Sequence, residues 1–198
     1  MQILTGYVQT ELVIKNSRFL NELFPCTKQE EARSIIKAQK TKYFDSTHVV
    51  HGFMLGLSGE IMGMSDDGEP SGTAGRPVLD VIKGRNCTNL VLTVTRWFGG
   101  TLLGTGGLVK AYGDGAKSVM EKAASDGLIQ EYVEKTVFNF TTDYSLHQSV
   151  RHLMEQFTIS ELSEEFGEGV KLSGKINASE YNYFGEKLKN LSNGKISL

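Results

Sequence analysis

The segment RWFGGTLLGTGGLVKAYGDG, at positions 96–115, combines residue types that bind anions. An apolar strand leads through closely spaced glycines into a helix, and the amides of such a turn point at a phosphate when no Cβ blocks its approach. Thr101 and Thr105 add hydroxyl donors, and Lys110 follows in the expected helix. The spacing fits neither a Walker loop nor a dinucleotide fingerprint, which needs a third glycine. An anion site and a structural role of the glycines in tight helix–sheet packing both stay open.

A second polar segment, SDDGEPSGTAGRP at positions 65–77, offers acidic side chains, amides and a guanidinium. Its candidate ligands for a divalent cation are Asp66, Asp67 and Glu69. They lack the spacing and the terminal glutamate of a calcium loop, so an ordered turn with aspartates capping amides explains them better. For the remaining polar residues, contact with an anion through Ser71, Thr73 and Arg76 is an open alternative to a structural role.

The histidines form no pair with ligand geometry. His48 and His51 are three apart in an expected strand and therefore face opposite sides of it. His147 and His152 are five apart on an expected helix, which misses the i, i+4 spacing of metal ligands. No serine or cysteine lies in a nucleophile elbow, and Asp114 has no partner that would make it a base. The sequence therefore assigns no catalytic residue, metal ligand or cofactor.

Aromatic side chains flank the glycine cluster. Trp97, Phe98 and Tyr112 lie near Arg96 and Lys110 in the sequence. Aromatic and basic side chains together stack the bases of single-stranded nucleic acid. Aromatic residues at the end of a buried strand more often belong to the core, so both roles are open for them.

Length and composition exclude several classes of protein. The chain has 198 residues, a net charge of −2 and a pI near 6.1, so an anion site must be a local cluster rather than a basic domain. Cys26 and Cys87 are 61 positions apart and form no metal or redox motif. The sequence contains neither a signal peptide nor an apolar run of about 18 residues. We therefore expect a soluble, cytoplasmic protein.

The apolar pattern predicts an N-terminal α/β domain at positions 1–134. Its expected elements are a hairpin turning at 15–17, a helix at 28–42, strands at 47–57 and 60–65, a short helix at 78–84, a buried central strand at 89–98 and a helix at 105–125. The strand at 89–98 is continuously apolar, which is typical of a strand buried on both faces. It therefore places the first glycine-rich segment at the edge of a core.

Positions 135–198 predict a second domain with the order βαββαβ. Its expected elements are strands at 135–144, 158–166, 169–176 and 195–198 and helices at 145–157 and 179–191. This order is that of a ferredoxin-like fold, so the whole chain is expected to be α+β, built from two α/β sandwich domains. Positions 136–198 carry six Lys/Arg against eight Asp/Glu, and the first 135 carry 15 of each. Neither domain is basic.

The two glycine-rich segments, in this order, resemble the Impact family, in particular its bacterial YigZ-type branch. The resemblance extends from KNSRF at positions 15–19 to Tyr112, and the C-terminal domain resembles the small domain that bacterial members carry. It implies an N-terminal domain similar to domain IV of elongation factor G and to a domain of a small-subunit ribosomal protein. The C-terminal domain would be similar to the ferredoxin-like domain V of the same factor.

The resemblance also implies a nucleic-acid or ribosome-associated role without an established reaction. Eukaryotic relatives regulate translation and carry a further partner-binding domain. Compared with many members, Trp97 replaces a tyrosine, Leu102 a lysine and Lys110 an arginine. The last two changes remove one phosphate contact and one bidentate donor.

The leading hypothesis is a non-catalytic, translation-associated protein that binds RNA or the ribosome. The two glycine-rich loops would form a groove with Arg76, Arg96 and Lys110 on its rim. The predicted anion-binding residues are Ser71, Gly72, Thr73, Arg76, Arg96, Gly99, Gly100, Thr105, Gly106, Gly107, Lys110 and Tyr112.

Two alternatives stand beside this hypothesis. One is a protein-binding adaptor that uses the acidic C-terminal domain. The other is an enzyme acting on a phosphorylated small molecule, with Gly104–Gly107 as the phosphate loop and Asp66 or Asp67 on magnesium.

Overall fold

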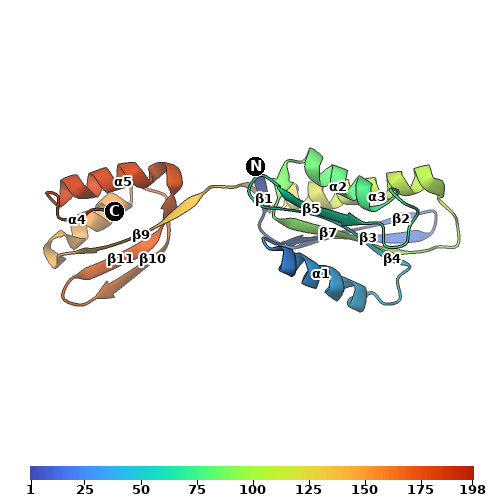
Figure 1. The fold of residues 1–198 in the computed structure, drawn as a ribbon, viewed down its shortest axis with the longest axis horizontal. Coiled ribbons are helices and arrows are strands. Elements are labelled where there is room, and N and C mark those ends of the chain that lie inside the picture. The colour runs from blue at the N-terminus through green and yellow to red at the C-terminus, as the bar shows by residue number, and fades with distance from the viewer. The chain divides into compact units, whose positions relative to one another are not determined.

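The computed structural model describes all 198 residues as two compact units, Met1–Tyr132 and Val133–Leu198 (Figure 1). Both units combine helices with sheets whose strands are mostly antiparallel, so the chain is α+β. No helix combines the length and the hydropathy of a membrane span.

A five-stranded antiparallel sheet forms the centre of the first unit. In spatial order its strands are β2 (Val8–Ile14), β3 (Ser17–Pro25), β7 (Leu90–Trp97), β4 (His48–Leu55) and β5 (Ile61–Ser65). Strand β7 is the middle strand, and every residue from Leu90 to Arg96 is buried. The prediction of a central strand buried on both faces is confirmed.

Helices cover the two faces of this sheet unequally (Figure 1). Helices α2 (Gly75–Gly84) and α3 (Gly104–Ser125) share one face, where the largest apolar cluster of the unit lies. Helix α1 (Gln29–Lys42) packs on the other face over a smaller cluster that includes Phe53 and Val91. Because side chains alternate along a strand, neighbouring residues of β4 and β7 belong to opposite faces.

The predicted hairpin forms between β2 and β3. Its two turn residues, Lys15 and Asn16, have φ angles of 46° and 66°, as a two-residue turn between twisted strands requires. A three-stranded sheet of β6 (Cys87–Thr88), β1 (Gln2–Leu4) and β8 (Ile129–Glu131) was not predicted. Strands of two or three residues are too short to show an alternating pattern.

The second unit has five of its six predicted elements. They are β9 (Lys135–Thr142), α4 (Tyr144–Met154), β10 (Ile159–Phe166), β11 (Val170–Asn177) and α5 (Ala178–Leu191), with the sheet order β10-β11-β9. The predicted closing strand at 195–198 is wrong. Ile196 is buried in the core of this unit, but its amide donates to the Ser192 hydroxyl and not to a strand, so the segment ends as an anchored coil.

Two glycines of α3 test how tightly this helix packs on the sheet. A Cβ on Gly115 would lie 2.2 Å from Oδ1 of Asn21, which is fully buried on β3, whereas a Cβ on Gly113 would meet no atom within 4 Å. We expect Gly115→Ala to destabilise the unit by about 1–3 kcal/mol through overpacking. Gly113→Ala should stabilise it by about 0.5–1 kcal/mol, because alanine favours the helix.

Denaturant unfolding followed by fluorescence of Trp97, the single tryptophan, measures both free energies in the unit that holds the helix. Equal effects of the two substitutions would contradict close packing of α3 at Gly115.

Candidate functional site

The two glycine-rich segments meet at a cavity of about 440 Å³ in the first unit. Strand β4 contributes His48, the loop before α2 contributes Glu69, and the end of β7 contributes Arg96. Phe98 and the first turn of α3, including Thr105, complete the lining. The cavity therefore joins a buried polar cluster to an apolar wall and a helix N-terminus.

A buried ion pair lies at the base of this cavity. The Nη1 atom of Arg96 donates to Oε1 of Glu69 at 2.6 Å, and the two side chains are only 6% and 3% exposed. The hydroxyl of Tyr112 donates to the same oxygen at 2.7 Å. Burial, followed by the bond to Glu69, raises the pKa of Tyr112, so this phenol stays protonated and acts as a donor. The three side chains join the loop, the sheet and α3.

The register of the sheet explains why these residues meet. Phe19 on β3 and His48 on β4 are the partners of Arg96 in the two ladders beside β7. All three side chains therefore point to the face that α3 covers, and the Phe19 and Tyr112 rings pack edge to face at 5.4 Å. His48 thus lies beside Arg96 because of its place in the register.

His48 is held in one orientation. Its Nδ1 atom lies 2.7 Å from the carbonyl oxygen of Asp67, and because a carbonyl only accepts, Nδ1 carries the hydrogen. Its Nε2 atom lies 3.8 Å from Oε1 of Glu69, and the residue lines the cavity. His51 lines a different cavity, under α1, so the prediction that the two histidines face opposite sides is confirmed.

The two aspartates of the loop are used to order it. Asp66 accepts hydrogen bonds from the amides of Gly72, Ala74 and Gly75, and thereby caps the start of α2. Burial alone would raise the pKa of Asp66, but these three amides outweigh burial and lower it.

Asp67 accepts from the amide of Val49 and from Lys40. Its pKa is lowered in spite of burial by these two donors. No group of three His, Cys, Asp or Glu side chains has an arrangement that would hold a metal ion.

The N-terminus of α3 lacks a side-chain cap. Leu103 is at the N-cap position, and no acidic residue lies in the first turn. The first amides of a helix have no partner within it and carry partial positive charge, so this turn offers donors to an anion. Gly104 has a φ of +73°, a conformation that other residues rarely adopt, and leads the chain into the helix beside the cavity.

The structure brings only some of the predicted site residues together. Arg96 and Thr105 line the cavity, and Tyr112 lies behind it on Glu69. Gly99 packs against β-hairpin backbone, since a Cβ there would lie 2.0 Å from the carbonyl carbon of Asn16.

The other predicted residues do not line the cavity. The Gly72 amide binds Asp66, the Thr73 hydroxyl donates to the Pro70 carbonyl, and Ser71 is exposed in the same turn. Gly100 adopts a φ of +82°, Gly106 is exposed, and Gly107 packs closely on Leu103.

The predicted basic rim differs from what the structure shows. Arg96 is buried and bound to Glu69, Arg76 binds Asp80 at 2.8 Å, and Lys110 binds Asp114 at 2.7 Å. Each predicted cation thus has a carboxylate partner, so the amides of α3 are the less neutralised donors near the cavity.

Sequence reasoning missed His48, Glu69 and Phe98 as cavity residues. The register of β4 and β7 was the signal that would have placed His48 next to Arg96. The sequence left open whether the aromatic residues stack bases or belong to the core. Tyr112 belongs to the core, whereas Phe98 is 45% exposed and lines the cavity.

Comparisons with known proteins match almost the whole chain. The description "Impact N-terminal domain" matches residues 15–120, and "Domain of unknown function (DUF1949)" matches residues 140–195. IMPACT family member YvyE of Bacillus subtilis (strain 168) is 36% identical over 190 residues, 95% of this chain and 85% of that protein. IMPACT family member YigZ of Escherichia coli (strain K12) is 30% identical over 187 residues, 93% of this chain and 90% of that protein.

Among solved structures, one described as "Crystal structure of an hypothetical protein" superposes with a TM-score of 0.67 at 30% identity. The superposition covers 98% of this chain and 93% of the chain in that structure.

The buried ion pair makes a testable contribution to stability. We expect Arg96→Met to destabilise the first unit by about 3–5 kcal/mol, because it leaves the Glu69 carboxylate buried without its cation. The same substitution at Arg76, whose pair with Asp80 is exposed, should cost less than about 1 kcal/mol.

In the double variant Arg96→Met/Glu69→Gln the loss should be smaller than in Arg96→Met alone, since no charge stays buried. Denaturant unfolding of the wild type, the two single variants and the double variant checks this. Similar losses of stability in Arg96→Met and Arg76→Met would show that the buried pair is not essential to the first unit.

Proposed function

The chain belongs to the Impact family, and we propose that it is a translation-associated protein that binds RNA or the ribosome without catalysing a reaction. The two glycine-rich segments indicated this family, and the match to the Impact N-terminal domain over residues 15–120 confirms it. Its implied link to translational control supports the choice of RNA and the ribosome as partners.

The observation that carries the proposal is the uncapped first turn of α3 beside the cavity. Its open amides suit a phosphate, and the missing Cβ of Gly104 and Gly106 leaves room for close approach of a backbone oxygen. Arg96 lines the same cavity, and its buried Nε atom has no hydrogen-bond partner.

Phosphate contacts of this kind position a nucleic acid without reading its sequence. Arg76 and Lys110 contribute little free charge in their pairs, so binding should depend on shape and amide geometry more than on attraction between net charges. The remaining predicted contacts at Ser71, Gly72 and Thr73 would act by keeping the loop before α2 in place.

The enzymatic alternative has less support. It needs Asp66 or Asp67 to hold magnesium, yet Asp66 already accepts from three amides and Asp67 from Val49 and Lys40. Glu69 is likewise occupied by Arg96 and Tyr112. The acidic second unit remains a candidate surface for a protein partner, which accords with a chain that works by binding.

A single added charge tests the proposed anion contact. Gly106 lies in the first turn of α3, where a Cβ would meet no atom within 4 Å. Gly106→Asp places a carboxylate where the phosphate would bind and is compatible with the helix, since acidic residues stabilise a helix N-terminus. We expect it to weaken RNA binding at least about tenfold, which corresponds to about 1.4 kcal/mol.

Gly106→Asn is the matched control, because it adds the same volume without the charge, and it should change binding less than about threefold. Co-sedimentation with ribosomes and anisotropy of a labelled RNA, both at low salt, give the readout. Equal binding by the Asp and Asn variants would rule out the α3 amides, and failure of the wild-type protein to bind either partner would overturn the proposed function itself.

A further inference from the structure

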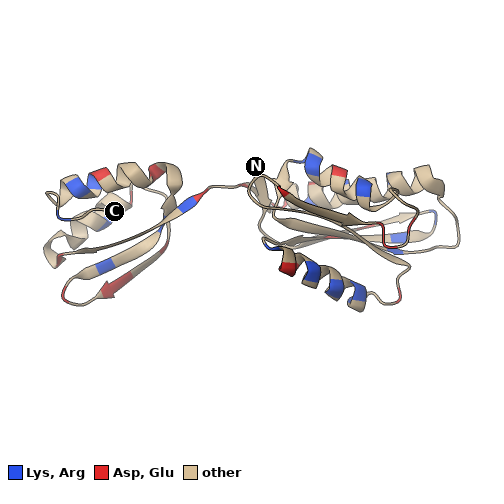
Figure 2. Cartoon of the chain, in the orientation of Figure 1, with Lys and Arg blue, Asp and Glu red and all other residues tan.

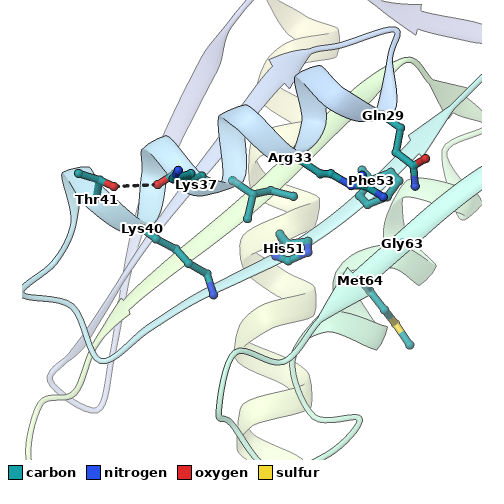
Figure 3. A pocket seen from close by; sticks show the side chains of 10 residues that line it. Gln29, Arg33, Lys37, Lys40, Thr41, His51, Phe53, Gly63 and Met64 are labelled. Carbon is teal, nitrogen blue, oxygen red and sulfur yellow. Dashed lines mark hydrogen bonds between the residues drawn. The ribbon is translucent and has the colours of Figure 1, made fainter.

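A second cavity, of about 610 Å³, lies on the opposite face of the five-stranded sheet, between α1 and the edge formed by β4 and β5. Figure 3 shows Arg33 and Lys40 extending from α1 toward β4, where His51 and Phe53 lie. Lys37 and Met64 also line this cavity. None of these residues belongs to the two glycine-rich segments, and none lines the first cavity.

The helix that forms one wall is basic. Between Gln29 and Lys42 it holds four Lys/Arg residues and two Asp/Glu residues, in a unit whose charges otherwise nearly cancel (Figure 2). Lys40 and Lys42 pair with Asp67 and Glu22, but Arg33 and Lys37 are exposed and form no ion pair. The cavity therefore has the free positive charge that the rim of the first cavity lacks.

The rings of His51 and Phe53 line the floor of the cavity, although Phe53 is only 9% exposed. Gly63 on β5 has no side chain to displace the Phe53 ring, since a Cβ there would lie 2.4 Å from it. Burial, and then the charge of Lys40, lowers the pKa of His51 to about 4, so this imidazole is uncharged at neutral pH. Its Nδ1 atom has no hydrogen-bond partner. A neutral ring beside an aromatic ring suits the face and edge of a base.

The sheet face beneath α1 also carries one row of polar residues beside its apolar cluster. Thr93 on β7 is the ladder partner of both His51 and Glu22, and these three residues form one row across β4, β7 and β3. Thr93 and Glu22 are fully buried, and each has an oxygen without a partner. These two residues do not line the cavity, so its preference for an anion over a lipid chain or an apolar peptide rests on the free cations Arg33 and Lys37 of α1.

We propose that this cavity binds one unpaired nucleotide of single-stranded RNA, with its base on His51 and Phe53 and its phosphates at Arg33 and Lys37. Free cations complement the phosphates, and the rings supply the stacking surface that single-strand binding proteins use. The inference rests on the proposed function for RNA as the partner. It adds a separate site on the other face of the sheet and a preference for unpaired strands.

A charge reversal confined to the cavity wall tests the site. The variant Arg33→Glu/Lys37→Glu changes two exposed side chains of α1, and Lys83→Glu/Lys117→Glu makes the same change of net charge on α2 and α3, away from the cavity. The probe is a labelled, unstructured 12-nucleotide RNA, measured by fluorescence anisotropy across a salt series. Unfolding followed by Trp97 fluorescence confirms that both variants fold.

We expect the Arg33/Lys37 variant to bind at least about tenfold more weakly and the Lys83/Lys117 variant to lose less than about threefold. Removal of two phosphate contacts should also reduce the slope of log K against log salt by about 1.4, since each contact with a single strand contributes about 0.7. A duplex of the same length should bind more weakly than the single strand.

Equal losses in the two charge variants, or equal binding of duplex and single strand, would overturn this site. So would an acidic peptide that displaces the RNA from α1 at lower concentration than unlabelled RNA does. If only Gly106→Asp weakens binding, the α1 site fails while the proposed function stands. If the wild-type protein binds no RNA at low salt, both fail.

Discussion

The buried bond between Arg96 and Glu69 is the constraint on which the first unit depends. It is the point where the acidic loop, the central strand and α3 meet, because Tyr112 donates to the same carboxylate. A charge pair this deep is stable only when its partners are fully placed. The need to place them explains why two segments far apart in the sequence carry such specific residues. It also explains why Arg96, which is a candidate RNA contact by sequence, serves first to hold the site together.

Because α3 is fixed in this way, the position of its first backbone amides at the surface is fixed as well. The helix begins without a side-chain cap, so its first amides stay available beside the cavity. On the opposite face, α1 covers the sheet incompletely and leaves a cationic cavity over polar and aromatic residues. The two anion surfaces proposed for this one sheet would differ in their physics. In the first, oriented amides would act at close range, whereas in the second, free cations would act at longer range.

Much of this fold could be predicted from the sequence, because most elements have clear periodicity. The central strand, α1, α3 and the turn at Lys15 followed directly from apolar patterning and turn chemistry. The predicted closing strand at 195–198 is absent. Its buried residue, Ile196, packs into the core of the second unit without any strand hydrogen bonds.

The candidate site was less predictable because it depends on partners distant in sequence. Residue type alone made Arg76, Arg96 and Lys110 look like free cations. Arg76 and Lys110 pair with carboxylates at i, i+4, which helical spacing could have shown. Only Arg96 pairs with a residue distant in sequence, Glu69. The sequence did not identify His48 and Glu69 as cavity residues, because their neighbours in the fold are also distant in the sequence. The cavity under α1 escaped notice because Arg33, Lys37 and His51 show no motif, and their proximity depends on the placement of a helix over a strand.

The central claim is that the first amides of α3 hold an RNA phosphate, and nuclear magnetic resonance tests it most directly. Titration of the ¹⁵N-labelled chain with a short single-stranded RNA should shift the amide signals of Gly104, Thr105 and Gly106, because hydrogen bonds to phosphate form at those atoms. Glycine amides of the second unit, such as Gly174, serve as internal references. RNA binding that shifts other signals and leaves the α3 amides unchanged would contradict the account.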